Sequence, residues 1–125
     1  MGCRLGQKKG SLSMEMSVEQ LDGGVVKAVL NGRLDIAGAA DIDMRFSVLA
    51  GANRAVIVDM AGVPFLASIG IRTLLIGAKS IQRRGGKMVL LRPTAEVEKV
   101  LWVSGVADLM PIFQDDASAL AAVAA

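Results

Sequence analysis

The feature that most constrains the fold is a short apolar run, Arg54–Met60, rich in valine and isoleucine. A run of this length and composition is typical of a strand buried on both faces. Lys87–Leu91 has the same character. Strands of this kind occur mainly in parallel sheets that helices cover on both sides. The two runs therefore predict the centre of an α/β sheet.

Helical and extended patterns alternate along the rest of the chain. Apolar and polar residues alternate over Ser13–Leu21, a turn signal follows at Asp22–Gly24, and Val25–Leu30 is apolar, which predicts a hairpin. Three helices are predicted to end at Gly51, at Gly85–Gly86 and at Gly105. The helices are predicted at Ile36–Ala50, Ser68–Arg84, Ala95–Ser104 and Ala117–Ala124. The last strand is predicted at Met110–Phe113.

This order predicts one α/β domain with a mixed, mainly parallel sheet of about five strands and about four helices. A length of 125 residues suits a single domain. The predicted domain covers residues 13–125. Residues 1–12 hold Arg4, Lys8 and Lys9 without an acid, and are predicted to be a flexible basic leader.

The absence of histidine and tyrosine, together with a single cysteine, restricts the chemistry open to the chain. Triads that use histidine are excluded, as are zinc sites that contain histidine or several cysteines. The carboxylates Asp35 and Asp59 have no visible acid–base companion. We therefore expect a binding protein rather than an enzyme, with no metal and no cofactor. Cys3, which has no partner in the chain, fits a reducing cytoplasm.

The net charge of +2 is unevenly distributed, with an excess of basic residues between positions 72 and 99. A nucleic-acid footprint and a solvated helix face both explain this excess. The second is favoured, because three of the four aromatic residues (Phe46, Phe65, Trp102 and Phe113) are predicted to lie in the core and leave no stacking platform. No stretch reaches the ~20 apolar residues of a membrane span. Neither direct nucleic-acid binding nor a membrane segment is expected.

The most unusual junction is Asp59–Ile71, where a strand leads into a helix that begins near Ser68. Sites in α/β sheets lie at such junctions. Ser68 fits two roles: a helix N-cap, which helix chemistry alone favours, and a phosphoacceptor at the positive end of the helix. Phe65–Ala67 is predicted to point inward. The apolar residues nearby form a contact surface if exposed and ordinary core if buried: Met60, Val63, Pro64 and Leu66.

Three segments together carry a family resemblance. They are Asn31–Asp35 (NGRLD), Val56–Met60 (VIVDM) and Phe65–Ile71 (FLASIGI). In this order and spacing the chain resembles the STAS domain, and more narrowly the bacterial anti-sigma-factor antagonists. The resemblance extends over about residues 13–123.

The resemblance implies a regulatory protein that switches between partners. In that family the unphosphorylated form binds an anti-sigma factor that is also a serine kinase, and so frees the sigma factor. Phosphorylation by the kinase ends the complex, and a serine phosphatase restores the first state. Ser68 occupies the phosphorylated position. The implied partner-binding residues are Asp35, Val63, Pro64, Phe65, Leu66, Ala67, Ser68, Ile69 and Arg72.

Two neighbours of Ser68 depart from the family pattern, which commonly has Asp before the serine and Ser or Thr after it. Here these positions hold Ala67 and Ile69. An alternative is therefore a STAS subunit that is not phosphorylated and stays docked on a transporter ATPase or a sensor complex. A small α/β enzyme or nucleotide-binding protein is a third possibility. Asp35 is expected either to lie near Ser68 or simply to cap a helix.

Overall fold

The computed structural model describes residues 14–124, so the predicted leader, residues 1–12, lies outside the described part of the chain. The sheet has the strand order β1-β2-β3-β4-β5. The β1–β2 pair is antiparallel and the other pairs are parallel, as the predicted hairpin and parallel runs require. The strands are β1 (Met14–Gln20), β2 (Val26–Gly32), β3 (Ala55–Gly62), β4 (Lys87–Leu91) and β5 (Ile112–Phe113).

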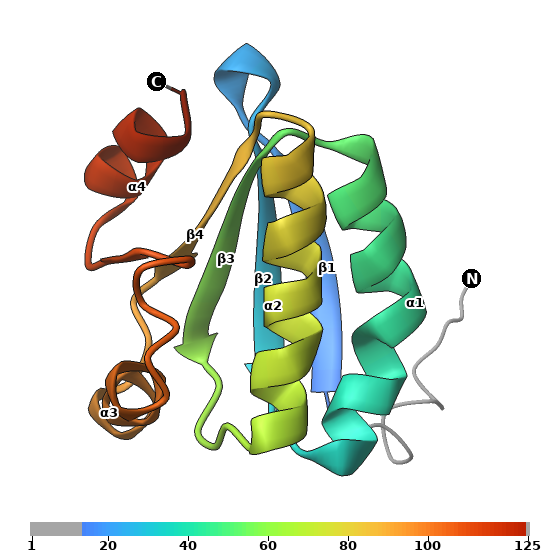
Figure 1. The fold of residues 1–125 in the computed structure, drawn as a ribbon, viewed down its shortest axis with the longest axis vertical. Helices are drawn as coiled ribbons and strands as arrows, with labels where there is room; N and C mark the ends of the chain where they lie inside the picture. The colour runs from blue at the N-terminus through green and yellow to red at the C-terminus, as the bar shows by residue number, and fades with distance from the viewer. Residues whose placement is uncertain (1–13, 125) are drawn as a thin grey trace.

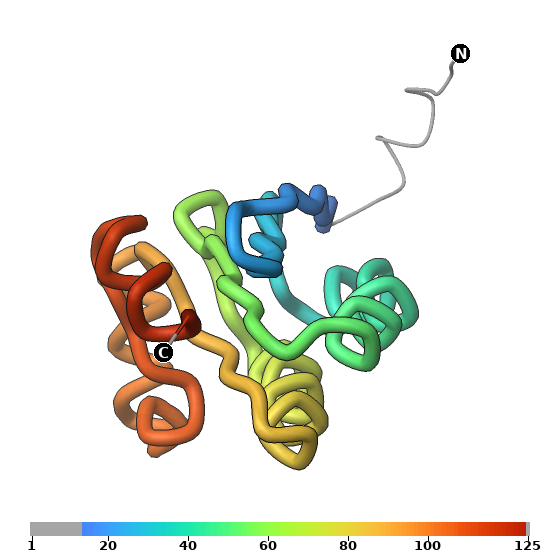
Figure 2. Tube along the Cα trace, turned by 90° about the horizontal axis from the view of Figure 1, so that it is seen from above, coloured from blue at the N-terminus to red at the C-terminus, as the bar shows by residue number. Residues whose placement is uncertain are grey.

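Helices cover the two faces of the sheet unequally. Two long helices, α1 and α2, lie on one face, and α4 packs on the other face against β3 and β4 (Figures 1 and 2). The helices are α1 (Ile36–Ala52), α2 (Ser68–Arg83), α3 (Ala95–Val103) and α4 (Asp116–Ala124), with a short 3₁₀ turn η2 (Asp22–Gly24) inside the hairpin. The predicted α/β architecture, with five strands and four α-helices among residues 14–124, is confirmed.

The apolar run in β3 is buried from both sides, as predicted. Val56, Val58 and Met60 join the larger core cluster, which includes buried residues of α1 and α2. Ile57 belongs to the smaller cluster together with Ala119 of α4. Alternate side chains of one strand thus reach opposite cores, which is why this strand lacks an amphipathic pattern.

Two details of the sequence prediction are wrong. Gly51 does not end α1, which continues to Ala52; Asn53 follows in extended conformation and donates a side-chain hydrogen bond to the Leu49 carbonyl at 2.9 Å.

Among the aromatic residues only Phe46 is fully buried, whereas Trp102 is 60% exposed. The short helix α3 buries only Val97 and Leu101, so its remaining side chains face outward.

Glycines in α2 allow this helix to approach its neighbours closely. A Cβ on Gly77 would lie 2.5 Å from Cε2 of Phe46 in α1. A Cβ on Gly70 would lie 2.7 Å from the carbonyl oxygen of Leu34. Because backbone cannot yield as a flexible side chain does, Gly70 fixes how closely the first turn of α2 sits against the β2–α1 loop.

We predict that Gly70→Ala lowers the free energy of unfolding by roughly 1–3 kcal/mol, since the added methyl overpacks this contact. Gly51→Ala is the matched control: a Cβ there meets nothing within 4 Å, and the substitution should add roughly 0.5–1 kcal/mol because the position is helical. Urea denaturation followed by circular dichroism measures both. A Gly70→Ala protein as stable as the wild type would contradict the packing argument.

Candidate functional site

Two loops are joined at the carboxyl end of the parallel strands. The β2–α1 loop and the β3–α2 loop pair through an isolated parallel bridge between Leu34 and Leu66. Leu34 N donates to the Phe65 carbonyl at 2.9 Å, and Ala67 N donates to the Leu34 carbonyl at 3.0 Å. As Figure 1 shows, this places the first turns of α1 and α2 side by side at one edge of the molecule. Asp35 and Ser68 each follow a residue of this junction.

Asp35 performs the capping role that the sequence predicted. Its Oδ1 accepts from Gly38 N at 2.9 Å, and its Oδ2 lies 3.3 Å from Nε of Arg33. These two partners, chiefly the Gly38 amide, hold the pKa of the Asp35 carboxyl below its usual value. Asp35 therefore stays ionised at neutral pH, beside the loop that leads to Ser68.

A contact between Arg33 and Phe65 connects the side chains of the two loops. The Arg33 guanidinium carbon lies 4.4 Å from the centre of the Phe65 ring, a cation–π distance. Phe65 is 40% exposed and so does not point wholly into the core, contrary to the prediction for Phe65–Ala67. Sequence reasoning missed Arg33, because the bridge that brings these distant loops together has no local sequence signal.

Ser68 is the first residue inside α2, not its N-cap. The N-cap is Ala67, with extended backbone and no side-chain cap hydrogen bond, so the capping role favoured for Ser68 is wrong. The serine is exposed, and the first turn of α2 contains no acidic residue. Amides at the start of a helix lack partners within the helix and form its positive end. The Ser68 hydroxyl thus lies at an exposed, electropositive helix start.

The structure divides the predicted partner-binding residues into three groups by exposure. The side chains of Val63 and Leu66 are buried in the larger core cluster and support the loop from below, so the core interpretation holds for them and for Met60. The exposed members of the set are Pro64, Phe65, Ser68, Ile69 and Arg72, while Asp35 and Ala67 are intermediate. Only these side chains are available to another protein.

An apolar groove continues this exposed group between α1 and α2. It is open to solvent, and Ile36, Ile69 and Ile76 line it together with Arg72 and Asp43. Ile36 is 77% exposed, unusually high for an isoleucine. Ile36 was not predicted as a site residue, although it directly follows the predicted cap Asp35. Contiguous exposed apolar surface of this kind marks interaction sites.

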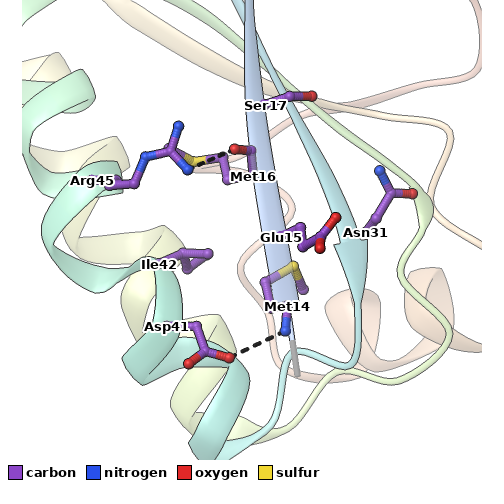
Figure 3. A pocket seen from close by; sticks show the side chains of 8 residues that line it. All are labelled: Met14, Glu15, Met16, Ser17, Asn31, Asp41, Ile42 and Arg45. Carbon is purple, nitrogen blue, oxygen red and sulfur yellow. Dashed lines mark hydrogen bonds between the residues drawn. The ribbon is translucent and has the colours of Figure 1, made fainter. Parts of the chain in front are cut away.

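A second hollow lies between α1 and the edge strand β1, and no predicted site residue lines it (Figure 3). Met14 N donates to Asp41 Oδ2 at 3.2 Å, and Arg45 Nη1 donates to the Met16 carbonyl at 2.8 Å (Figure 3). These side chains of α1 bind backbone groups of the edge strand, as natural proteins do to protect sheet edges. We therefore interpret this hollow as structural.

Asp59, considered as an acid–base candidate, is held in ion pairs. Its Oδ2 lies 3.7 Å from Lys27 Nζ and 3.5 Å from Arg92 Nη2. Both cations also contact Asp116 of α4, at 3.0 and 3.2 Å. The four residues form a network on the face of the sheet that α4 covers.

Comparison with known proteins agrees with this geometry. A family model described as the STAS domain matches residues 16–119. The chain belongs to the STAS family. The resemblance noted from NGRLD, VIVDM and FLASIGI is thereby confirmed.

The similar proteins bear the names of regulators. BtrV of Bordetella bronchiseptica, assigned as an anti-sigma factor antagonist, is 26% identical over 110 residues, which cover 87% of this STAS chain and 94% of BtrV. A structure from Thermotoga maritima, assigned likewise, superimposes with a TM-score of 0.80 at 22% identity, covering 86% of this chain and 93% of that one. The phosphorylated form of Bacillus SpoIIAA gives a TM-score of 0.66 at 23% identity, with 86% and 98% covered.

The same fold also occurs inside a larger protein. Murine Slc26a9, an anion transporter, gives a TM-score of 0.69 at 17% identity, covering 88% of this chain and 22% of the transporter. Within residues 14–124 of the STAS chain, no helix has the length and apolarity needed to cross a membrane. The chain thus shares its fold both with proteins named as anti-sigma factor antagonists and with a part of a transporter.

We predict that the stabilising effect of Asp35 disappears in acid. A carboxyl whose pKa is lowered by folding contributes its full stability above its unfolded pKa of about 3.9 and loses it as the pH falls through the folded pKa. The difference in unfolding free energy between the wild type and Asp35→Asn should thus be constant from about pH 5 to 8 and shrink below about pH 4. Urea denaturation across this range measures it. A difference that grew on acidification would refute the assignment.

Proposed function

We propose that this STAS protein is a phosphorylation-switched antagonist of an anti-sigma factor. Its unphosphorylated form binds an anti-sigma factor that is also a serine kinase, and thereby releases the sigma factor. Phosphorylation of Ser68 ends this binding, and a serine phosphatase restores it. The cycle takes place in the cytoplasm.

The observation that carries the proposal is the setting of Ser68. The residue begins α2 and is exposed; the exposed Ile69 directly follows it, and the exposed Phe65 lies three residues before it. Family membership and the likeness to BtrV support the identity of the partner class. The existence of a phosphorylated form of SpoIIAA, whose fold this chain shares, supports a modification within the family.

The charge of a phosphate explains why modification would end binding. A phosphoserine carries about −1.5 to −2 charges at pH 7. Ser68 lies beside apolar side chains that a partner would cover, and a dianion in such a contact must lose its water. The helix start stabilises the phosphate in the free protein. The free phosphorylated form is therefore favoured over the docked one.

The switch is tested by incubating the protein with its kinase and ATP and measuring intact mass. We expect one added phosphate on the wild type and none on Ser68→Ala. Binding to the anti-sigma factor, measured by calorimetry, should be close to wild type for Ser68→Ala and weakened at least about tenfold for Ser68→Asp. Phosphate on the Ser68→Ala protein would refute the assignment of the site.

The contact surface is tested by truncating an exposed side chain. Phe65→Ala should raise the dissociation constant at least about tenfold, because buried aromatic side chains carry a large share of interface energy. Val48→Ala is the matched control: Val48 is 66% exposed but lies in the last part of α1, away from the joined loops. Equal effects of the two substitutions would contradict the location of the surface.

A second candidate function is a constitutive subunit of a transporter or sensor assembly. The likeness to part of Slc26a9 and the departures at Ala67 and Ile69 favour it, although the sequence identity is lower than with BtrV. In this case Ser68→Ala and Ser68→Asp would bind the partner equally well. The calorimetry above separates the two candidates.

A further inference from the structure

The carboxyl end of β3 contains one residue more than the strand beside it. Val29 of β2 pairs with Asp59, and Asn31 pairs with Gly62. Two steps along β2 therefore correspond to three steps along β3, which is a β-bulge. Bulges bend a strand and change the direction in which it leaves a sheet. Immediately after this one, the chain enters the loop that leads to Phe65 and Ser68.

Asp59 supplies a hydrogen-bond acceptor inside the bulge. Its Oδ1 accepts from Ala61 N at 3.0 Å, two residues further along. Asp59 is only 8% exposed whereas Ala61 is exposed, so this bond is partly buried. Directly beyond it, Val63 N donates to the Met60 carbonyl at 3.0 Å and begins the turn out of the sheet. The carboxylate thus lies at the point where the strand changes direction.

The other oxygen of Asp59 fixes the orientation of the side chain. Lys27 of β2 and Arg92, which follows β4, approach Oδ2 from the two neighbouring strands. Both cations are held from outside by Asp116 of α4. A side chain held from both sides presents Oδ1 to Ala61 at little entropic cost.

We propose that Asp59 is a positioning residue for the binding loop. By holding the bulge, its carboxylate sets the direction in which Val63–Ala67 leaves β3, and so the place of Phe65 and Ser68 at the surface. The part of this inference that concerns partner affinity rests on the proposed function. The part that concerns loop order is a property of the free protein.

Hydrogen exchange of the full chain, read by NMR, tests the proposal with three variants. Asp59→Ala removes the acceptor and the charge. Asp59→Asn keeps an oxygen for Ala61 N but removes the charge. Asp116→Ala removes a carboxylate from the same two cations without touching the bulge. Amides of β4 report global unfolding and serve as the internal reference.

We expect the amides of Ala61, Gly62 and Val63 to exchange at least about tenfold faster in Asp59→Ala, relative to β4, since a net hydrogen bond corresponds to roughly this factor. Asp116→Ala should stay within about twofold of wild type. Asp59→Asn should fall between these two variants, because it retains an oxygen that can accept from Ala61 N but loses the ion pairs that orient the side chain. Affinity for the anti-sigma factor should follow the same order, with at least a fivefold loss only for Asp59→Ala. If that variant fails to fold, Asp59→Leu, which keeps the branching at Cγ but has no acceptor, takes its place.

Unchanged loop exchange in Asp59→Ala would overturn the proposal, and so would equal effects of Asp59→Ala and Asp116→Ala. Increased exchange with unchanged affinity would overturn the link to binding. If the wild type binds no anti-sigma factor, the proposed function fails, while the exchange data still decide the role of Asp59.

Discussion

The candidate site depends on one pair of backbone hydrogen bonds, those that join Leu34 to Phe65 and Ala67. These bonds hold the β2–α1 loop and the β3–α2 loop side by side. The pairing is possible because Gly70 leaves room for the Leu34 carbonyl against the first turn of α2. The positions of Asp35, Arg33 and Ser68 all follow from this approach. A side chain at Gly70 would therefore disturb the pairing of the two loops as well as the packing.

The architecture could be predicted because its signals are local. The apolar run at 54–60 identified the strand buried on both faces, and the alternation before Asp22 identified the hairpin. The cap Asp35 was predicted from residue type, and its side chain accepts the expected amide hydrogen bond. Turn and cap chemistry acts over three or four residues, so one sequence contains all the information it needs.

The main errors occur where contacts between segments far apart in the sequence determine the conformation or the burial of a residue. Ser68 has the chemistry of a cap, yet the bridge to Leu34 fixes Ala67 in extended conformation and places the serine one residue inside the helix. Val63 and Pro64 are adjacent and both apolar, and only the path of the loop decides that Val63 is buried and Pro64 exposed. The β3 bulge depends on a register between two strands that are far apart in the sequence. The pattern of apolar and polar residues within β3 gives no sign of this bulge.

The apolar setting of Ser68 changes the electrostatic logic of the proposed switch. Where an acidic residue precedes the serine, the surface is already negative before modification, and a phosphate increases an existing charge. Here Ala67 and Ile69 are neutral and the first turn of α2 has no acid, so a phosphate would be the first negative charge in that turn. Asp35, which follows Leu34 in the joined loop, is already paired with Arg33 and the Gly38 amide. The charge of this surface therefore differs strongly between the two states, because phosphorylation would turn an uncharged apolar contact into a negatively charged one. On this reasoning, the substitutions that weaken the resemblance to the family would sharpen the response of the surface to phosphorylation.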